Sequence, residues 1–125
     1  MNWHDVLKRD DIVGGDVEIY EDDNLFRGPI KSITLKDGMV TIELEWCATV
    51  PIPGRPGFWV WRAIHVVVAL LVSSTIEPRD LGDNRVMISA PALGTWIIYP
   101  KGGSKLDPAN VAGLKVPHPA KKPKP

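Results

Sequence analysis

The feature that most constrains this chain is the alternation of apolar and polar residues in MVTIELEWCATV, at positions 39–50. Val40, Ile42, Leu44 and Trp46 occupy every second position, and polar or charged residues stand between them. Successive side chains of a β-strand point to opposite faces, so this pattern predicts a half-buried antiparallel strand with one wet face. We therefore expect the fold to be built on an antiparallel sheet.

The residues before this strand predict its neighbours. Asp37-Gly38 favours a tight hairpin turn, because both residue types tolerate positive φ. Residues 25–35 precede that turn and have the composition of an extended strand, interrupted by Gly28-Pro29. Proline cannot donate to a strand ladder, so this strand is expected to lie at an edge or to bend at a bulge. Residues 17–20, VEIY, predict one more short strand.

The residues after the alternating strand predict a loop and a return strand. Positions 50–57, VPIPGRPG, contain three prolines and are expected to reverse the chain. Positions 58–72, FWVWRAIHVVVALLV, are rich in valine and aromatic residues, which favour a strand over a helix. The aromatic cluster at the start of this segment is therefore interpreted as part of a buried strand, and not as an exposed ligand clamp.

An aromatic cross-strand pair suggests the register of the two strands. We expect Trp46 to lie opposite Trp61, which places Leu44 opposite Ala63. Both tryptophans would then point into the core, and Cys47 would lie on the wet face.

Two shorter strands are expected to complete the sheet, at 85–90 and 93–100, bounded by prolines and by Asp83-Asn84. Residues 73–84 form a polar excursion between them and the long strand. Its length is high for a structureless loop, so it is either a functional loop or it contains a helical turn around residues 78–81.

Short helical turns are expected near both ends of the chain. Asn2 can cap a helix within residues 1–11, with Asp5 at the third helical position. Asp107-Pro108 has the cap-then-proline pattern of a second helix start. Residues 115–125 consist mostly of proline and lysine and are predicted to form a disordered tail after a single domain at 1–114.

The stretch GGDVEIYEDDNLFRGPIKSITLKDGMVTIELEW, at 14–46, resembles the first three strands of the Src-homology-3-like small barrels, including the Tudor and Sm-like types. The resemblance is one of pattern, and no binding residue of a specific family carries over. It implies a small antiparallel β-barrel or sandwich of five to six strands with short terminal helical turns. Such barrels commonly bind peptides, modified side chains or RNA, which is an analogy of fold alone.

Charge is balanced overall but not along the chain. The formal net charge is zero, so the total indicates neither nucleic acid nor membrane as a partner. Residues 1–23 carry eight acids and two bases, a net of −6, whereas residues 101–125 carry six lysines and one acid, a net of +5. This asymmetry is compatible with intramolecular attraction, head-to-tail self-association, or two solvated ends.

Cys47 is the single cysteine, so no disulfide can form within the chain. The three histidines, at 4, 65 and 118, have no spacing that suggests a shared metal, and no cofactor-binding motif is present. The strongest apolar run is shorter than the ~20 residues that a membrane helix needs. A cytoplasmic protein is expected, with no cofactor and no metal.

One sheet face is a candidate binding surface. If the tryptophans point inward, Phe58, Val60, Arg62 and Ile64 share the opposite face, and Arg55 stands at the tip of the preceding loop. So much apolar area on a supposedly wet face needs a cover.

Three covers are possible for that face. The N-terminal helix could supply Trp3, Val6 and Leu7, the C-terminal turn could supply Val111 and Leu114, and a partner subunit is the third option. The sequence does not choose between them.

Two functions from different classes remain. The favoured prediction is a non-enzymatic interaction module that joins or tunes a protein assembly through this face or the 50–57 loop. The alternative is a nucleic-acid-associated barrel, whose phosphate contacts would come from Arg27, Lys31, Lys121, Lys122 and Lys124. An enzyme is the third possibility, because no catalytic constellation is present.

Overall fold

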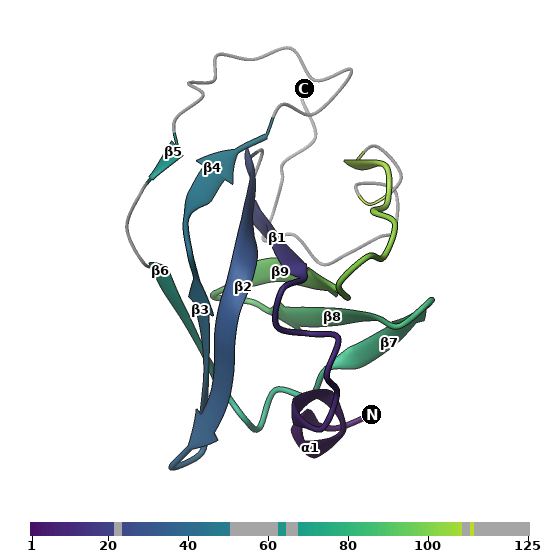
Figure 1. Cartoon of the computed structure of the whole chain (residues 1–125). Coiled ribbons are helices and arrows are strands. Elements are labelled where there is room, and N and C mark those ends of the chain that lie inside the picture. Colours follow the sequence, from purple (N-terminus) through teal and green to yellow (C-terminus); the bar gives the residue numbers. More distant parts are fainter. Residues whose placement is uncertain (22–23, 51–62, 65–67, 109–110, 112–125) are drawn as a thin grey trace, which may run out of the picture.

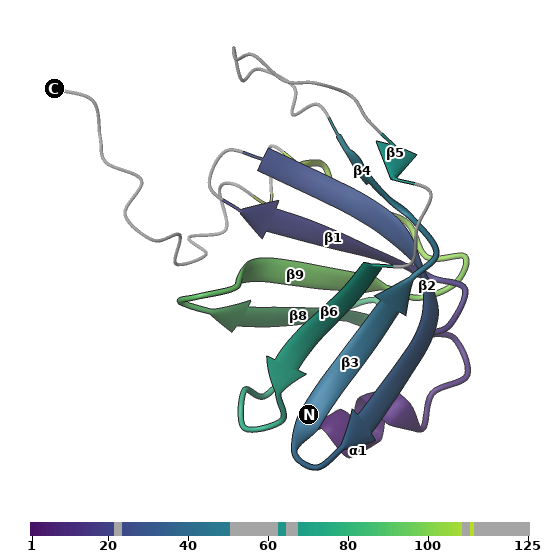
Figure 2. The same cartoon turned by 90° about the vertical axis from the view of Figure 1, so that its left-hand side faces the viewer.

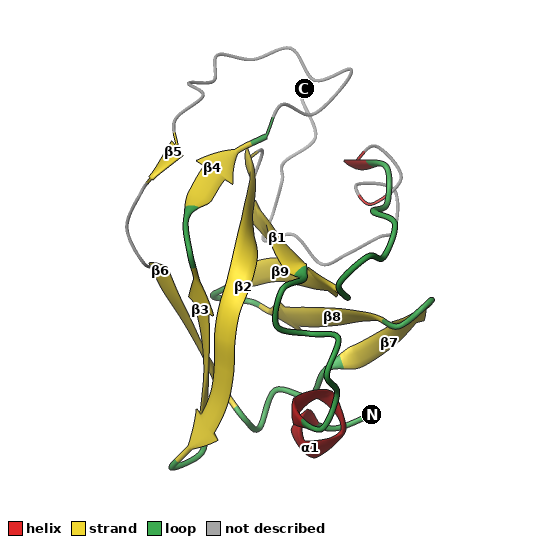
Figure 3. Cartoon of the chain, viewed as in Figure 1, coloured by secondary structure: helices red, strands yellow, loops and turns green. Residues whose placement is uncertain are grey.

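The computed structural model describes the chain except for residues 22–23, 51–62, 65–67, 109–110 and 112–125 (Figure 1). The described part contains one helix and nine strands. These are α1 (Trp3–Leu7), β1 (Asp16–Glu21), β2 (Asn24–Lys36), β3 (Met39–Leu44), β4 (Cys47–Thr49), β5 (Ala63–Ile64), β6 (Val68–Ser73), β7 (Arg79–Gly82), β8 (Arg85–Ala90) and β9 (Gly94–Tyr99). The expected mainly β fold with a short N-terminal helix is confirmed (Figure 3).

The strands form two antiparallel sheets that share β2 (Figure 2). The larger sheet has the order β5-β4-β2-β1-β9-β8-β7, and the smaller sheet consists of β2, β3 and β6. The first part of β2 pairs with β1 and β4, whereas its second part pairs with β3. Over the described residues the sheet does not close into a barrel, because β5, β6 and β7 each have a strand neighbour on one side only.

β2 serves both sheets because it bends, as Gly28-Pro29 predicted. The register of its pairing with β3 shifts between Ile30 and Ser32, which marks a bulge. A Cβ atom on Gly28 would lie 2.0 Å from the carbonyl oxygen of Trp46, so only glycine fits where the two segments cross. The bend directs the second half of β2 away from the larger sheet and opens the space for the core.

The main core fills the space between the two sheets. The smaller sheet contributes Val40, Ile42, Leu44 and Val72, and β1, β8 and β9 face them from the other side. α1 closes one end of this core, as its position beside β8 and the β2–β3 hairpin shows (Figure 1). The indole Nε1 of Trp3 donates to the carbonyl oxygen of Ile76 at 2.7 Å, so the helix is tied to the loop after β6.

The predicted cap of α1 is present in full. The side chain of Asn2 accepts from the backbone N–H of Asp5, and the Asp5 carboxylate accepts from the backbone N–H of Asn2, both at 2.9 Å. This reciprocal pair satisfies two of the orphan donors of a short helix.

A second, smaller core lies on the other face of β1, β8 and β9. In β9, Trp96 and Ile98 point into the main core, whereas Ile97 and Tyr99 point into the second one. The segment after β9 covers this face, and Val111 is buried there. β9 is therefore buried on both faces.

An ion pair and a backbone hydrogen bond join the two ends of the described chain. Lys105 Nζ forms an ion pair with Asp16 at 2.7 Å, and the backbone N–H of Lys101 donates to the carbonyl oxygen of Asp11 at 2.6 Å. Val111 donates its backbone N–H to the carbonyl oxygen of Asp107 at 3.1 Å, as expected for a helical turn that begins at Pro108. The ion pair between Lys105 and Asp16 agrees with the intramolecular interpretation of the charge asymmetry.

The predicted alternation through Trp46 is wrong at its last step. β3 ends at Leu44, and the backbone N–H of Glu45 donates to the carbonyl oxygen of Pro29 at 3.0 Å, at the bend of β2. Because of this interruption, the alternation that buries the even-numbered positions of β3 does not continue through Trp46 into β4. Trp46 is therefore 39% exposed and Cys47 is buried, the opposite of what the pattern predicted.

The predicted strand register is also wrong. Leu44 pairs with Val68 of β6, not with Ala63, and Ala63 pairs with Ala48 of β4. One long return strand was expected where the structure has the separate strands β5 and β6, which pair with different partners. Trp61 lies outside the described residues.

The excursion at 73–84 contains a strand where a helical turn was one expectation. β7 pairs with β8, and the hairpin between them turns at Asp83 and Asn84, whose φ angles are 54° and 62°. Both residue types tolerate this left-handed region, which tight hairpins require. The predicted strands at 85–90 and 93–100 are confirmed as β8 and β9. Within the described residues, no helix has the length and apolar character needed to cross a membrane.

Candidate functional site

The outer edge of the smaller sheet exposes apolar side chains. Leu71 in β6 is 53% exposed, and Met39 in β3 is 40% exposed. β6 has the sequence VALLVS, which contains no charged residue. It pairs with β3 on one side, and no described strand pairs with its other side. We call this unpaired side of β6, together with Leu71 and Met39, the β6 edge.

The alternation within β6 determines which residues face outward. Val72 is buried in the main core, and Val68 and Leu70 pack partly against it. Ala69 and Leu71 point to the opposite, outer face of the smaller sheet and are exposed.

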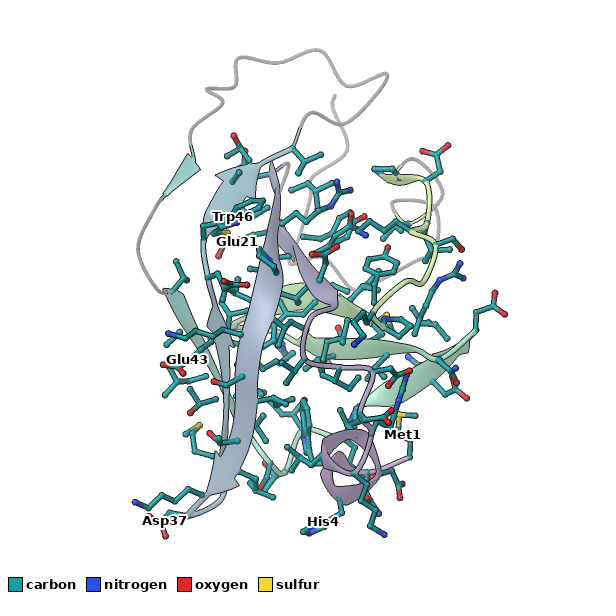
Figure 4. All side chains as sticks on the ribbon, in the orientation of Figure 1. Met1, His4, Glu21, Asp37, Glu43 and Trp46 are labelled. Carbon is teal, nitrogen blue, oxygen red and sulfur yellow. The ribbon has the colours of Figure 1, made fainter. Side chains whose placement is uncertain are left out.

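The cross-strand neighbours of these residues come from β3. Thr41 lies opposite Leu71, Glu43 lies opposite Ala69, and Met39 lies opposite Ser73. Figure 4 shows Glu43 on the side of the smaller sheet that faces away from β8 and β9, and Asp37 at the tip of the β2–β3 hairpin.

The β6 edge contains no charged residue, although Glu43 lies beside it in β3. Glu43 is held away from it, because its carboxylate accepts from the hydroxyl of Ser32 in β2 at 2.7 Å. Native proteins usually protect an edge strand with a lysine, a proline or a bulge. β6 contains none of these devices within its six residues. The edge can therefore accept a further strand through its backbone N–H and C=O groups.

A second unusual feature is a carboxylate buried in the smaller core. Glu18 in β1 is fully buried. Its Oε2 accepts from Nε of Arg27 at 2.9 Å and from Nη2 of the same guanidinium. Its Oε1 accepts from the hydroxyls of Tyr20 at 3.0 Å and Tyr99 at 2.8 Å. Both carboxylate oxygens are thus fully used within the fold.

Strand register explains how these four side chains meet. Glu18 lies opposite Arg27 of β2 on one side and opposite Ile97 of β9 on the other. Tyr20 follows two residues later on the same face, and Tyr99 follows Ile97 in the same way. The carboxylate is therefore surrounded by donors from three adjacent strands.

The two tyrosines stay protonated in this cluster. Burial raises the pKa of Tyr20 and of Tyr99, and the neighbouring negative charge of Glu18 raises both further. Each phenol can therefore donate to the carboxylate across the physiological range. The hydroxyl of Tyr99 also accepts from the backbone N–H of Leu106 at 3.2 Å, which ties the covering segment to the cluster. The cluster is a closed structural unit.

The other polar features of the described chain give weaker evidence for a binding or catalytic site. A cavity of about 260 Å³ lies beside α1, lined by Asn2, Trp3, His4, Leu35, Ser74, Thr75 and Glu77. Two of its polar groups already have partners, since Asn2 caps α1 and the Thr75 hydroxyl bonds to that of Ser73 at 2.8 Å. No group of three or more His, Cys, Asp or Glu side chains in the described part could hold a metal ion.

Cys47 is a poor candidate for a nucleophile. It is buried, and burial raises the pKa of its thiol, so the reactive thiolate is disfavoured at neutral pH.

The residues predicted to bind partners are only partly within the described chain. Ile64 lies in β5 opposite Cys47, and only its backbone is described. Arg27 forms an ion pair with Glu18 within the fold. Lys31, also in β2, is exposed. The remaining candidates lie outside the described residues: Arg55, Phe58, Val60, Arg62, Lys121, Lys122 and Lys124.

Sequence reasoning missed both features of this section. The strand VEIY was correctly predicted, but Glu18 has the character of an ordinary surface residue there. β6 was interpreted as the interior of a long strand, because its run of apolar residues is typical of a buried strand. The absence of charge in VALLVS was the signal that could have marked an unprotected edge.

Comparison with known proteins found no matching family model, no matching curated protein and no matching solved structure. The function is therefore argued from the geometry of the chain itself.

Proposed function

We propose that this protein is a non-enzymatic interaction module that joins another chain at the β6 edge. The observation that supports this most directly is that β6 has no charged residue and no described strand neighbour on one side, and that Leu71 within it is 53% exposed. An extended segment that adds to such an edge gains main-chain hydrogen bonds, and its alternate side chains contact the sheet faces.

The β6 edge leaves part of the apolar side chains of Leu71 and Met39 exposed to water. Complete burial of a leucine is worth about 1.5–3 kcal/mol, so covering the exposed half of Leu71 contributes about 1 kcal/mol. Met39 contributes a similar amount when the same partner covers it. A stable interface buries about 1,200–2,000 Å² in total, so the partner must extend over the outer face of β3 as well.

Three further expectations from the sequence, on fold similarity, location and contact surfaces, are part of the same proposal. We propose that the fold is similar to that of the Src-homology-3-like barrels. A cytoplasmic location is also proposed. The apolar face around Phe58 and the 50–57 loop are proposed as further contact surfaces. They precede β6 along the chain, and they stay predictions because they lie outside the described residues.

The nucleic-acid alternative rests on fewer residues than the sequence indicated. The charge of Arg27 is compensated by Glu18 within the fold. Lys31 is exposed and available, and the tail lysines complete the alternative. Binding to RNA through lysines would weaken steeply with added salt, whereas an apolar strand contact would not.

Photo-crosslinking in the native cell tests the proposal. A photo-reactive amino acid replaces Leu71, and a matched control carries it at Thr34, which is exposed on β2 of the same sheet, two strands away from β6. We expect a protein adduct from position 71 at several times the yield from position 34. The crosslinked protein, once identified and purified, should bind the wild-type chain at least ~10-fold more tightly than the Leu71→Lys variant. Equal yields from both positions would overturn the proposal.

A further inference from the structure

We infer that the partner at the β6 edge is a short extended segment of another protein, which carries an apolar residue opposite Leu71 and an arginine two positions later, opposite Ala69. This inference rests on the proposed function and specifies the sequence of its partner. The free backbone groups of β6, the small size of Ala69 and the position of Glu43 in β3 carry it.

The register of β3 and β6 determines which backbone groups of β6 are free. The backbone N–H of Ser74 donates to the carbonyl oxygen of Gly38 at 2.8 Å, one position beyond the last pair of the two strands. Hydrogen-bonded and non-hydrogen-bonded pairs alternate along an antiparallel ladder, so the even-numbered residues of β6 bond to β3. The odd-numbered residues Ala69, Leu71 and Ser73 therefore direct their N–H and C=O groups to the unpaired side.

The free part of this edge is short. The carbonyl oxygen of Ser73 already accepts from the backbone N–H of Ile76 at 3.0 Å, where the chain turns after β6. The groups left for a partner are the N–H and C=O groups of Ala69 and Leu71 and the N–H of Ser73. They match the backbone of about five residues in an added strand. We take this strand as antiparallel, because antiparallel pairing is slightly more stable per residue than parallel pairing.

Small residues in β6 let the side chains of such a strand reach β3. Directly opposed residues point to the same face, so the partner residues opposite Ala69, Leu71 and Ser73 lie on the outer face. The residue opposite Leu71 packs against the most exposed large apolar side chain of the described chain. A long apolar side chain opposite Ser73 passes over that small residue to Met39, its neighbour in β3, which is 40% exposed. An in-plane strand therefore contacts β3 through its side chains.

Glu43 determines which charge is favoured at the other end of the segment. It lies opposite Ala69 in β3, and its Oε1 accepts from the hydroxyl of Ser32. Its Oε2 has no hydrogen-bond partner among the described residues. Neighbouring strands lie about 4.8 Å apart, and arginine is long enough to cross the methyl group of Ala69 and pair with this carboxylate. An acidic residue at that position would be repelled. The favoured partner sequence is therefore Φ-x-Φ-x-R, where Φ is a large apolar residue.

Titration of the isotope-labelled full chain with a synthetic peptide tests the pairing by NMR. The peptide is LVLTR, acetylated at one end and amidated at the other. We expect a dissociation constant of about 1 mM or lower, as for a weak specific contact. The amide signals of Ala69, Leu71 and Ser73 should shift most. Those of Leu70 and Val72 should shift less, because their N–H groups already bond to β3.

Charge reversal at position 43 tests the choice of partner. The wild type should bind LVLTR at least ~3-fold more tightly than LVLTE, because a surface attraction is exchanged for a repulsion. Glu43→Lys should invert this order. Glu45→Lys, an exposed control with the same change of net charge, should preserve it. Circular dichroism checks that both variants fold. An unchanged order in Glu43→Lys, equal binding of LVLTR and the reversed peptide RTLVL, or no binding of LVLTR would overturn the inference.

The photo-crosslink at position 71 separates this inference from the proposed function. An adduct with a protein whose crosslinked segment lacks the Φ-x-Φ-x-R pattern would sink the inference and support the function. Absence of any position-specific adduct, together with no binding of the peptides, would sink both. An adduct whose crosslinked segment carries the pattern supports both.

Discussion

Arg27 of β2 and Glu18 of β1 form an ion pair in which the carboxylate is fully buried and the guanidinium side chain is 31% exposed. The guanidinium of Arg27 therefore contacts water, whereas the carboxylate of Glu18 does not. The ion pair also explains how an acidic residue can occupy a core position, because a buried charge needs a partner and hydrogen bonds on its remaining lone pairs.

Removal of the arginine should destabilise the fold. Arg27→Ala leaves Glu18 buried without its counter-charge, and breaking such a pair costs about 3–5 kcal/mol. The partial exposure of Arg27 allows water to enter, so we expect about 2–4 kcal/mol in the free energy of unfolding. Urea denaturation measures it. Lys31→Ala, on the exposed part of the same strand, is the control and should stay within about 0.5 kcal/mol. Equal stability of both variants would contradict the described role of the pair.

Alkaline pH should unfold the protein through its tyrosines. The chain contains two tyrosines, Tyr20 and Tyr99, and both have a pKa raised in the folded state by burial and by Glu18. Their stabilising effect is complete below the unfolded pKa of about 10. Above it, the unfolded phenols release protons that the folded ones keep, and stability falls by about 1.4 kcal/mol per pH unit for each tyrosine.

Phenolate absorbance provides the measurement, since all of it comes from these two residues. It should rise only when the protein unfolds, and it should coincide with the loss of the circular dichroism signal. The Tyr99→Phe variant should halve the slope of stability against pH that the two tyrosines contribute. Titration near pH 10 in a protein that is still folded would show that the hydroxyls are accessible.

The thiol of Cys47 should be protected from reagents. It is 7% exposed, and burial raises its pKa, so both access and thiolate formation are suppressed. Reaction with a thiol-specific disulfide reagent should be at least ~100-fold slower in the native protein than in urea, because it requires opening of the core. The exposed thiol of Thr34→Cys is the matched control and should react within the mixing time. A fast native reaction would contradict the buried position that the structure gives Cys47.

Gly28 should tolerate no side chain. The Cβ atom of Gly28→Ala would meet the Trp46 carbonyl oxygen, a backbone atom, at 2.0 Å. We expect a loss of about 3 kcal/mol or more in unfolding free energy. Gly82→Ala is the control: it has φ +85° but no atom within 4 Å, so its cost is the backbone strain alone, about 1 kcal/mol. Thermal unfolding of the three proteins gives the comparison.

The predictions that succeeded rest on signals within a few residues. The capping box of Asn2 and Asp5 and the turn at Asp37-Gly38 depend only on local hydrogen bonds and backbone preferences, and both are present. The failures concern contacts between distant segments. The position of Trp46 depends on where β2 bends, and the bend depends on the crossing at Gly28. No periodicity around Trp46 contains that information.

The candidate sites illustrate the same limit. Glu18 takes its hydrogen bonds from Arg27 and Tyr99, and the latter lies in the last strand. The strand VEIY was predicted, but the distant segments that cover Glu18 were not. For Leu71, the apolar run indicated an extended conformation but as part of one long strand, and which side of β6 remains unpaired among the described residues follows only from the topology.

The pairing of β1 with β9 also determines when the chain can fold. The first strand completes its ladder only with the last one, so most of the described chain must leave the ribosome before β1 can be closed on that side. Contacts of such high sequence separation slow folding, because a long loop must close before any contact is gained. Until β9 emerges, β1 and β8 therefore each lack the strand neighbour that β9 will provide, in addition to the open side of β6. The risk of pairing with a wrong strand is highest during this period of synthesis.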